Sequence, residues 1–322
     1  MDRLSPAAYG HGAMLAFSAI VAGSFSLGVQ VAGDISPIAL SAVRFWLAAA
    51  VLGAALFLTI GLPRGSLRAS WRYAVLGGLF GGYFVLMFEG LKTASPVSTA
   101  AVFTLTPIMS AVFGWPLLRQ RTTPRMAVAL LIGGCGALWV IFRGDASALL
   151  AFDVGRGELI YFVGCIAHAL YTPLVRRLNR GEPVLVFSFG TLIGGGVVLS
   201  LFGVREIAAT DWAGLPHLVW VVLVYLAVFA SALSVWLLQT AALRLPAAKV
   251  MAYTYLVPSW VLVWEAVGGV PMPGSVVLVG IAMTVIALLL LLRDEDAHRP
   301  DLSSRSSDSR NRSKSSRFTG SN

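Results

Sequence analysis

The chain has 322 residues, of which 57% are hydrophobic and only 12% are charged, and its formal net charge at pH 7 is +9. Soluble domains usually carry about 25% charged residues, so this composition excludes a soluble globular domain and indicates an integral membrane protein. The excess positive charge does not indicate nucleic-acid binding, because a nucleic-acid reader would need a soluble domain. We expect the basic residues to fix topology and to contact anionic lipid headgroups instead.

Apolar runs of about 20 residues, enough to cross a ~30 Å hydrocarbon core as a helix, cover most of the sequence. Because backbone groups in lipid must find hydrogen-bond partners within each segment, we expect helices rather than strands. The sequence thus predicts an all-α integral membrane fold. We place ten spans at 13–31, 38–61, 73–90, 95–117, 126–142, 157–175, 184–204, 217–241, 247–268 and 273–292. The first is too long for a typical cleaved signal peptide, so we interpret it as a retained anchor.

Lysine and arginine are distributed unequally between the two sets of connections. One set, which includes both termini, contains Arg64, Arg68, Arg72, Arg119, Arg121, Arg125, Arg176, Arg177, Arg180, Arg244 and Lys249. The other set contains Lys92, Arg143, Arg156 and Arg205. Cytoplasmic connections collect basic residues. We therefore expect a multi-pass protein of the cell (inner) membrane with both termini in the cytoplasm.

The two halves of the sequence share landmarks in the same order. The segment LKTASPVSTAAVFTLTP at 91–107 has a counterpart in LRLPAAKVMAYTYLVP at 243–258, and Pro37 and Pro183 open the second span of each half. Each half has five spans, an odd number, so the second half enters the membrane from the opposite side. We therefore predict two inverted five-helix repeats, at 13–142 and 157–292.

Two segments flank these predicted repeats. Residues 1–12 form a cytoplasmic N-terminal segment, and residues 293–322 form a Ser/Arg-rich cytoplasmic tail. The tail lacks apolar periodicity, so we expect it to be disordered.

Several segments resemble those of a known transporter family. SPIALSAVRFWLAAAVL at 36–52 resembles the second-helix signature of EamA-type transporters in the drug/metabolite transporter (DMT) superfamily. GLKTASPVSTAAVFTLTPIMSAVFG at 90–114 and AALRLPAAKVMAYTYLVPSWVLVWE at 241–265 resemble the family's AL…a…l.P segment, and CIAHALYTPLVRRL at 165–178 resembles the start of its second domain. The resemblance covers about 13–292 and implies a ten-helix bundle with a central cavity that moves small metabolites. The sequence departs from the family in lacking a Gly-Glu pair after the fourth and ninth helices, and in having His168 at an aromatic position.

Among the ionisable residues of the predicted spans we single out Arg44, Glu89, His168 and Glu265. A charge at mid-membrane costs about 2.5–3.5 kcal/mol on insertion scales, so such residues are candidate functional groups. Arg44, Glu89 and Glu265 all lie in the outer half, where we expect them to form a salt-bridged cluster. Arg44 would then bind an anionic substrate group or close an outer gate; the alternative is that it snorkels outward while the acids lie in interfacial water.

His168 lies near mid-depth in the sixth span. Imidazole exchanges protons near neutral pH, which makes His168 the candidate for proton coupling or substrate contact. The alternative is a neutral packing histidine.

The fourth and ninth spans contain Pro107 and Pro258 near their centres. Proline removes a backbone hydrogen bond and kinks a helix, so both are candidate hinges. Further candidates for the wall of a substrate cavity are Tyr83, Tyr171, Trp236, Gln239, Tyr253 and Thr254. The alternative is that these aromatic residues belong to the core or to the interfacial belt.

These features favour a non-enzymatic secondary transporter over two alternatives. An integral membrane enzyme such as a lipid-linked transferase would need a carboxylate pair or a nucleophile with a base, and a channel would show a filter. The sequence shows neither, and it has no metal-ligand spacing or nucleotide-binding motif, so we expect no metal and no cofactor. The expected partners are the lipid bilayer and a small molecule, either an amino acid, a nucleobase-like compound or a drug. We expect export, with protons as a candidate coupling ion; the sequence leaves open whether the chain forms a homodimer.

Overall fold

The computed structural model describes residues 6–66, 68–151 and 154–293. Over these residues the regular structure is entirely helical. The helices are α1 (Pro6–Val29), α2 (Pro37–Thr59), α3 (Trp71–Leu91), α4 (Pro96–Phe103), α5 (Thr106–Leu118), α6 (Pro124–Ile141), α7 (Ala146–Ala151), α8 (Arg156–Leu178), α9 (Val184–Phe202), α10 (Val204–Ala209), α11 (His217–Ala227), the π-helix η1 (Val228–Leu233), α12 (Ser234–Ala242), α13 (Ala247–Ala252), the 3₁₀-helix η2 (Tyr253–Leu256), α14 (Val257–Val267) and α15 (Ser275–Arg293).

Ten segments of the described chain are long and apolar enough to cross a membrane, which confirms the predicted fold class. Seven consist of one helix each, whereas α4–α5, α11–η1–α12 and α13–η2–α14 are interrupted spans. The first helix begins at Pro6 and so includes part of the segment that we placed outside the membrane region. The short helices α7 and α10 lie in connections and were not predicted. The predicted disordered tail lies outside the described residues, apart from Arg293.

Local sequence sets where the helices begin. Proline occupies the first turn of α2, α4, α5, α6 and α14, where its missing N–H would have no helical partner in any case. The Ser95 hydroxyl accepts a hydrogen bond from the Ser98 N–H at the start of α4, and Thr123 does the same for Met126 at the start of α6. Such side-chain caps satisfy N–H groups that have no partner within the helix.

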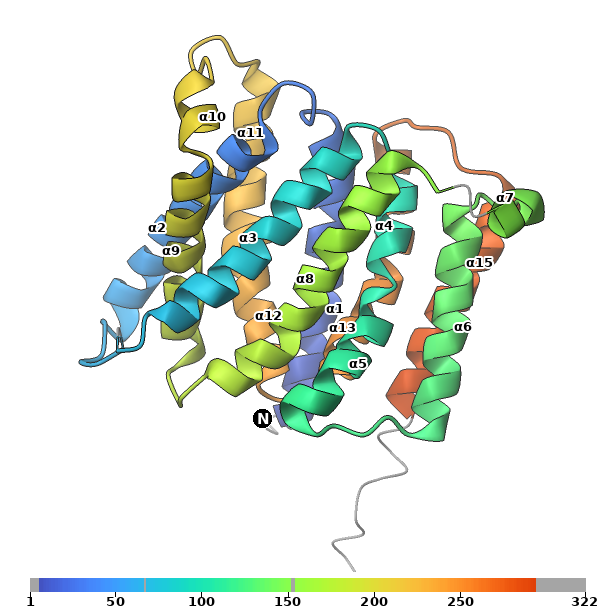
Figure 1. Ribbon diagram of the computed structural model, residues 1–322, viewed down its shortest axis with the longest axis horizontal. Coiled ribbons are helices and arrows are strands. Elements are labelled where there is room, and N and C mark those ends of the chain that lie inside the picture. Colours follow the sequence, from blue (N-terminus) through green and yellow to red (C-terminus); the bar gives the residue numbers. More distant parts are fainter. Residues whose placement is uncertain (1–5, 67, 152–153, 294–322) are drawn as a thin grey trace, which may run out of the picture.

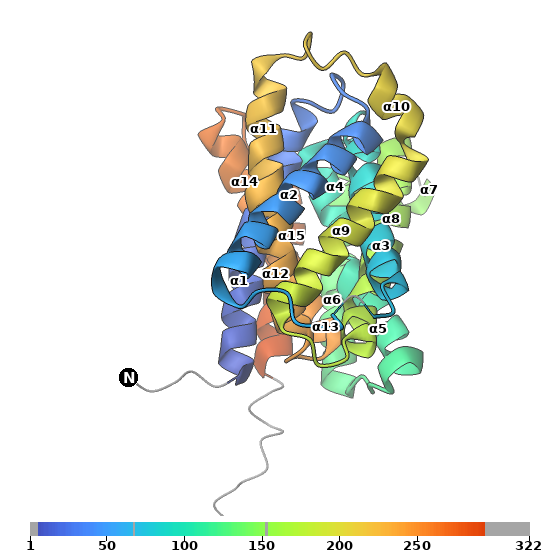
Figure 2. The same cartoon turned by 90° about the vertical axis from the view of Figure 1, so that its left-hand side faces the viewer.

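The connections divide between two ends of the bundle. Figure 1 shows the connections after α2, α5, α8 and α12 at the lower end, together with the N-terminus, and the others at the upper end. Figure 2 shows the same separation from the side, with the α10–α11 connection at the top. The lower end is the one that collects the arginines, as the sequence pattern predicts.

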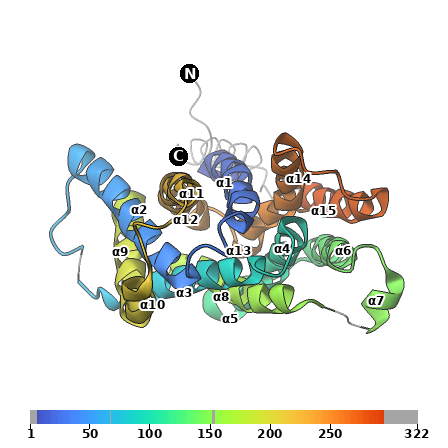
Figure 3. The ribbon, with the colours of Figure 1, turned by 90° about the horizontal axis from the view of Figure 1, so that it is seen from above.

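The helices pack as two inverted repeats. In the first half α1 packs against α12 and α14 of the second half. In the second half α8, the equivalent of α1, packs in the same way against α3 and α5 of the first half. The pairs α2–α9 and α6–α15 each join equivalent helices of the two halves. Seen from above, these two pairs lie at opposite edges of the molecule (Figure 3). The centre is therefore formed by α1, α3, α8, α12 and the interrupted spans.

Glycine allows α3 and α9 to pack in backbone contact. A Cβ added at Gly77 on α3 would lie 2.6 Å from the Gly195 Cα on α9, whereas one added at Gly82 on the same helix would meet no atom within 4 Å. Small residues at a helix crossing allow this close approach in membranes.

This contact predicts a difference in stability between two alanine variants on α3. We expect Gly77→Ala to lower the free energy of unfolding by about 1–3 kcal/mol, because the α9 backbone cannot yield as a flexible side chain would. Gly82→Ala should be neutral or stabilising by up to about 1 kcal/mol, because alanine favours helix. Unfolding of both variants in detergent micelles measures the difference. Equal stability of the two variants would contradict the close contact.

Candidate functional site

The two proline-containing breaks lie side by side at the centre of the bundle. Pro107 lies in the first turn of α5 and Pro258 in the first turn of α14. Because proline has no backbone N–H, it cannot donate the hydrogen bond that would continue the preceding helix, and each span is interrupted there. The hydroxyls of Thr106 and Thr254 are hydrogen-bonded at 3.3 Å across the two repeats. The Thr106 hydroxyl is also within donating distance, 2.6 Å, of the Phe103 carbonyl. The predicted interruptions are thus present and in contact with each other.

The break in the ninth span is a 3₁₀ turn and not a simple kink. Residues Tyr253–Leu256 form η2, so Thr254 does not continue the helical face of Glu265 on α14. The Tyr253 hydroxyl forms a hydrogen bond with His11 Nδ1 at 2.9 Å, which brings α1 against the break. The side chain of Thr254 is fully buried.

His168 on α8 is enclosed by aromatic rings from both repeats. Its ring centroid lies 4.4 Å from that of Tyr83 and 5.2 Å from that of Phe103, both edge to face. The remaining rings around it are Phe17 on α1, Phe80 on α3 and Tyr171 on α8. We call His168 and these five aromatic residues the His168 cluster. His168 is 1% exposed, and both of its ring nitrogens are buried without a hydrogen-bond partner.

Gln239 connects the His168 cluster to α9 and α12. Its amide nitrogen donates hydrogen bonds to the Tyr171 hydroxyl at 2.9 Å and the Thr191 hydroxyl at 3.0 Å, and its oxygen accepts one from Ser188 at 2.7 Å. Gln239 and Tyr171 are fully buried, while Trp236, three residues earlier on α12, is half-buried. The structure therefore brings Tyr171 and Gln239 into one hydrogen-bond network.

Arg44 on α2 is fully buried and is held by neutral groups. Its Nε donates to the Ser231 hydroxyl at 2.7 Å, and its Nη2 donates to the Ala230 carbonyl at 2.9 Å. Both acceptors belong to the π-helix η1. In a π-helix the backbone hydrogen bonds join residues five apart, so its carbonyl groups are placed differently from those of an α-helix. The guanidinium carbon lies 3.6 Å from the centroid of the Phe84 ring, in a cation–π contact.

The predicted salt-bridged cluster of Arg44, Glu89 and Glu265 is wrong for the described structure. Glu89 pairs with Lys92 at 2.7 Å on the surface, where a cation three residues along the same helix is the nearer partner. Glu265 lies in the last turn of α14 and lines a pocket together with Arg143. Arg44, Glu89 and Glu265 thus have different partners or surroundings, and the three side chains do not pair with one another.

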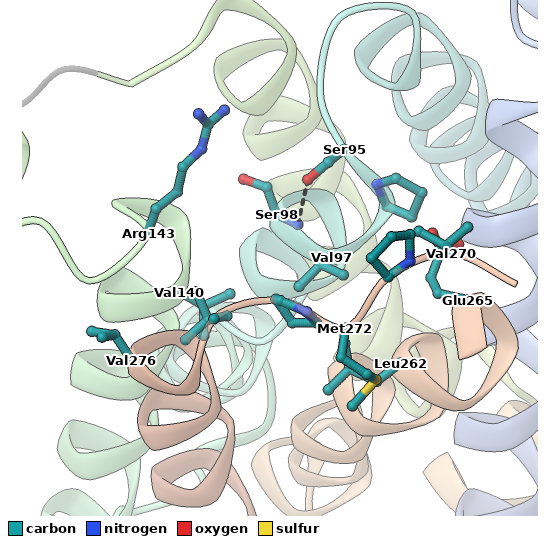
Figure 4. Close-up of a pocket in the computed structure, with 15 residues that line it drawn as sticks. Ser95, Val97, Ser98, Val140, Arg143, Leu262, Glu265, Val270, Met272 and Val276 are labelled. Carbon is teal, nitrogen blue, oxygen red and sulfur yellow. Dashed lines mark hydrogen bonds between the residues drawn. The ribbon is translucent and has the colours of Figure 1, made fainter.

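The pocket beside Glu265 has a volume of about 500 Å³ and opens at the upper end of the bundle. Figure 4 shows Glu265 and Arg143 on opposite sides of it, with Ser95 and Ser98 above and Leu262 and Met272 below. Ser98 also donates to the Glu158 carboxylate of α8 at 2.8 Å. This pocket is separate from the His168 cluster.

A second ion pair lies at the lower end of the bundle. Arg72 on α3 contacts Glu182, in the α8–α9 connection, with an N–O distance of 2.6 Å, and it donates to the Leu178 carbonyl. Burial would raise the pKa of the Glu182 carboxyl, but hydrogen bonds from Arg72 and from the Arg180 N–H outweigh this and lower it. The pair links the two repeats near the cytoplasmic face that the arginine pattern predicts.

This geometry defines a class of protein. Two inverted repeats of membrane-spanning helices, with paired broken helices and unpartnered polar groups at their junction, are the architecture of a membrane transporter. The chain belongs to the EamA-like transporter family, whose sequence model matches residues 8–142 and again residues 155–293.

Comparisons with individual proteins agree with this family. The chain is 29% identical to the uncharacterized transporter YyaM of Bacillus subtilis (strain 168), over 86% of this chain and 91% of the relative. It is 24% identical to the uncharacterized transporter YetK of the same organism, over 76% of this chain and 75% of the relative. A solved structure, titled only as the crystal structure of a protein, superposes with a TM-score of 0.69 at 22% identity, covering 92% of this chain and 100% of the other. That structure supports the fold alone.

Proposed function

We propose that this protein is a secondary transporter that exports a small metabolite across the cell (inner) membrane by alternating access. The observation that carries the proposal is the His168 cluster, where a buried imidazole without a hydrogen-bond partner lies at the junction of the two repeats. Burying a polar group without a hydrogen-bond partner is costly, so such a group calls for an explanation. We infer that His168 gains a partner in another conformation of the bundle. A solute or a proton that reaches His168 when the bundle opens would supply the missing partner.

The inverted repeats favour alternating access over a channel. Two copies of one fold with opposite orientation have two near-equivalent arrangements, each open to one side. The hydrogen bond between Thr106 and Thr254 joins the two break points, so both half-helices can move together. The sequence encodes no nucleotide-binding motif, which favours a gradient or exchange as the source of energy. Amino acids, nucleobase-like compounds and drugs remain the proposed substrates.

Reconstitution tests this function. Liposomes containing the purified protein are loaded with a mixture of amino acids and nucleobases, and the solutes that leave are identified by mass spectrometry without ATP. We expect one class of solute to leave several-fold faster than from protein-free vesicles, and an imposed proton gradient to change that rate. Glu89→Gln is the matched control, because Glu89 pairs with Lys92 at the surface, and it should transport at the wild-type rate.

Two outcomes would contradict the proposal. Release no faster than from protein-free vesicles would exclude transport of these solutes. Release that does not saturate with solute concentration would instead indicate a channel, because a carrier must bind its solute before it moves.

A further inference from the structure

Arg44 is a buried cation for which the described part of the chain supplies no anion. A guanidinium stays charged in proteins, so its charge needs compensation. The acidic residues that lie closest to the spans are engaged elsewhere: Glu89 pairs with Lys92, and Glu158 accepts from the Ser98 hydroxyl. Glu265 lines the pocket at the upper end of the bundle. Arg44 therefore differs from Arg72, which is equally buried but has the carboxylate of Glu182.

The contacts of Arg44 leave one edge of the guanidinium without an acceptor. Its Nε and Nη2 are bonded to Ser231 and Ala230, whereas Nη1 is buried and has no hydrogen-bond partner. The Ser41 hydroxyl, one helical turn earlier on α2, is likewise buried without a partner. Because residues three apart lie on one side of a helix, Ser41 and Arg44 lie on the same face of α2.

The neutral groups around Arg44 do not balance its charge. The Ala230 carbonyl is shared, since it also accepts from the Ser234 hydroxyl at 2.8 Å. The Phe84 ring covers one face of the guanidinium at 3.6 Å and leaves the in-plane N–H groups as the place for a further ligand. Carboxylates bind guanidinium groups in this plane, often with two hydrogen bonds.

The aromatic rings continue from Arg44 to His168. Phe84, under the guanidinium, lies 4.7 Å from Tyr83, and Tyr83 lies 4.4 Å from His168. Arg44 and His168, which both have buried nitrogens without a partner, therefore lie at the two ends of a row of rings formed by Phe84 and Tyr83 on α3. A solute bound at Arg44 would have its remaining atoms beside these rings.

We propose that Arg44 binds the carboxylate of the transported solute, and that the protein therefore carries organic acids or other solutes with a carboxylate group. This assignment rests on the proposed transport function, since the buried guanidinium is reached only when the bundle opens. The carboxylate supplies the anion that the described residues do not place beside Arg44, and the acceptor for Nη1.

Charge-selective binding tests the assignment without a transport measurement. The purified protein in chloride-free buffer is heated with benzoate, benzamide or benzylamine, which have similar shapes and are anionic, neutral and cationic. We expect benzoate to raise the unfolding midpoint at a concentration at least about tenfold lower than benzamide, because hydrogen bonds to charged groups are the stronger ones. Benzylamine should have no effect.

Variants separate Arg44 from other basic residues. Arg44→Gln should bind benzoate and benzamide equally, and Arg44→Lys should keep a preference for benzoate that is weaker than that of the wild type. Arg143→Gln, at an exposed arginine in the upper pocket, should behave as the wild type. Since the comparison of three ligands on the wild-type protein needs no variant, the test stands even if Arg44→Gln does not fold.

Three results would overturn the assignment. They are equal binding of benzoate and benzamide by the wild type, retention of benzoate selectivity in Arg44→Gln, and stabilisation by chloride that benzoate does not increase. The last would mean that an inorganic anion fills the site. These failures differ from a failure of the proposed function, which would appear as absent transport in liposomes while binding persists.

Discussion

Replacing Pro107 and Pro258 together by alanine should slow transport by at least about tenfold while the protein stays folded. In the broken spans each proline lies in the first turn of a half-helix, but in a continuous helix the same position would be interior, where alanine is about 3 kcal/mol more favourable than proline. Each interrupted span would then favour a continuous helix. Because the two breaks are joined through Thr106 and Thr254, a stiffened pair would resist the change between the two access states. Solute efflux from liposomes measures the rate.

The control for this variant is Pro116→Ala. Pro116 also lies inside α5, but it is exposed and remote from the break between α4 and α5. It should transport at the wild-type rate. The double variant should also unfold at a temperature equal to or higher than that of the wild type, which separates loss of movement from loss of structure. Transport by the double variant at the wild-type rate would show that the breaks are not hinges.

The fold was predictable because its signals are local. Apolar length sets the spans, and prolines set the beginnings of helices and the two central breaks. The shared order of landmarks in the two halves predicts the two repeats without any knowledge of how the helices pack. The π-helix η1 carried no such signal: VFASAL at 228–233 contains neither glycine nor proline and is typical of an ordinary helix.

The arrangement of the site was less predictable because depth in the membrane does not give position around the bundle. The sequence placed Arg44, Glu89 and Glu265 in the outer half, but packing separates them. Phe80, Phe103 and Ser231 were missed, since a buried aromatic residue or serine beside a site has the same sequence pattern as one in the core. His11 was missed because it precedes the predicted start of the first span.

Replacing His168 by glutamine should remove the dependence of transport on pH between 5 and 8. Imidazole is the one side chain that ordinarily titrates in this range. The other titratable groups in the His168 cluster are the phenols of Tyr83 and Tyr171, which ordinarily titrate near pH 10. Wild-type efflux should therefore vary by about tenfold across this range if His168 releases a proton in one access state and binds one in the other.

Two further variants distinguish proton coupling from packing. His168→Phe fills the space among the rings without a titratable group, so it should keep stability and lose pH dependence, as the glutamine variant does. His217→Gln changes an exposed histidine at the start of α11 and should keep the wild-type profile. If His168→Gln retained the pH profile, His168 would be a packing residue and the coupling ion would bind elsewhere. If both His168 variants lost transport at every pH, His168 would contact the solute itself, because removing a proton carrier alone leaves downhill movement of the solute intact.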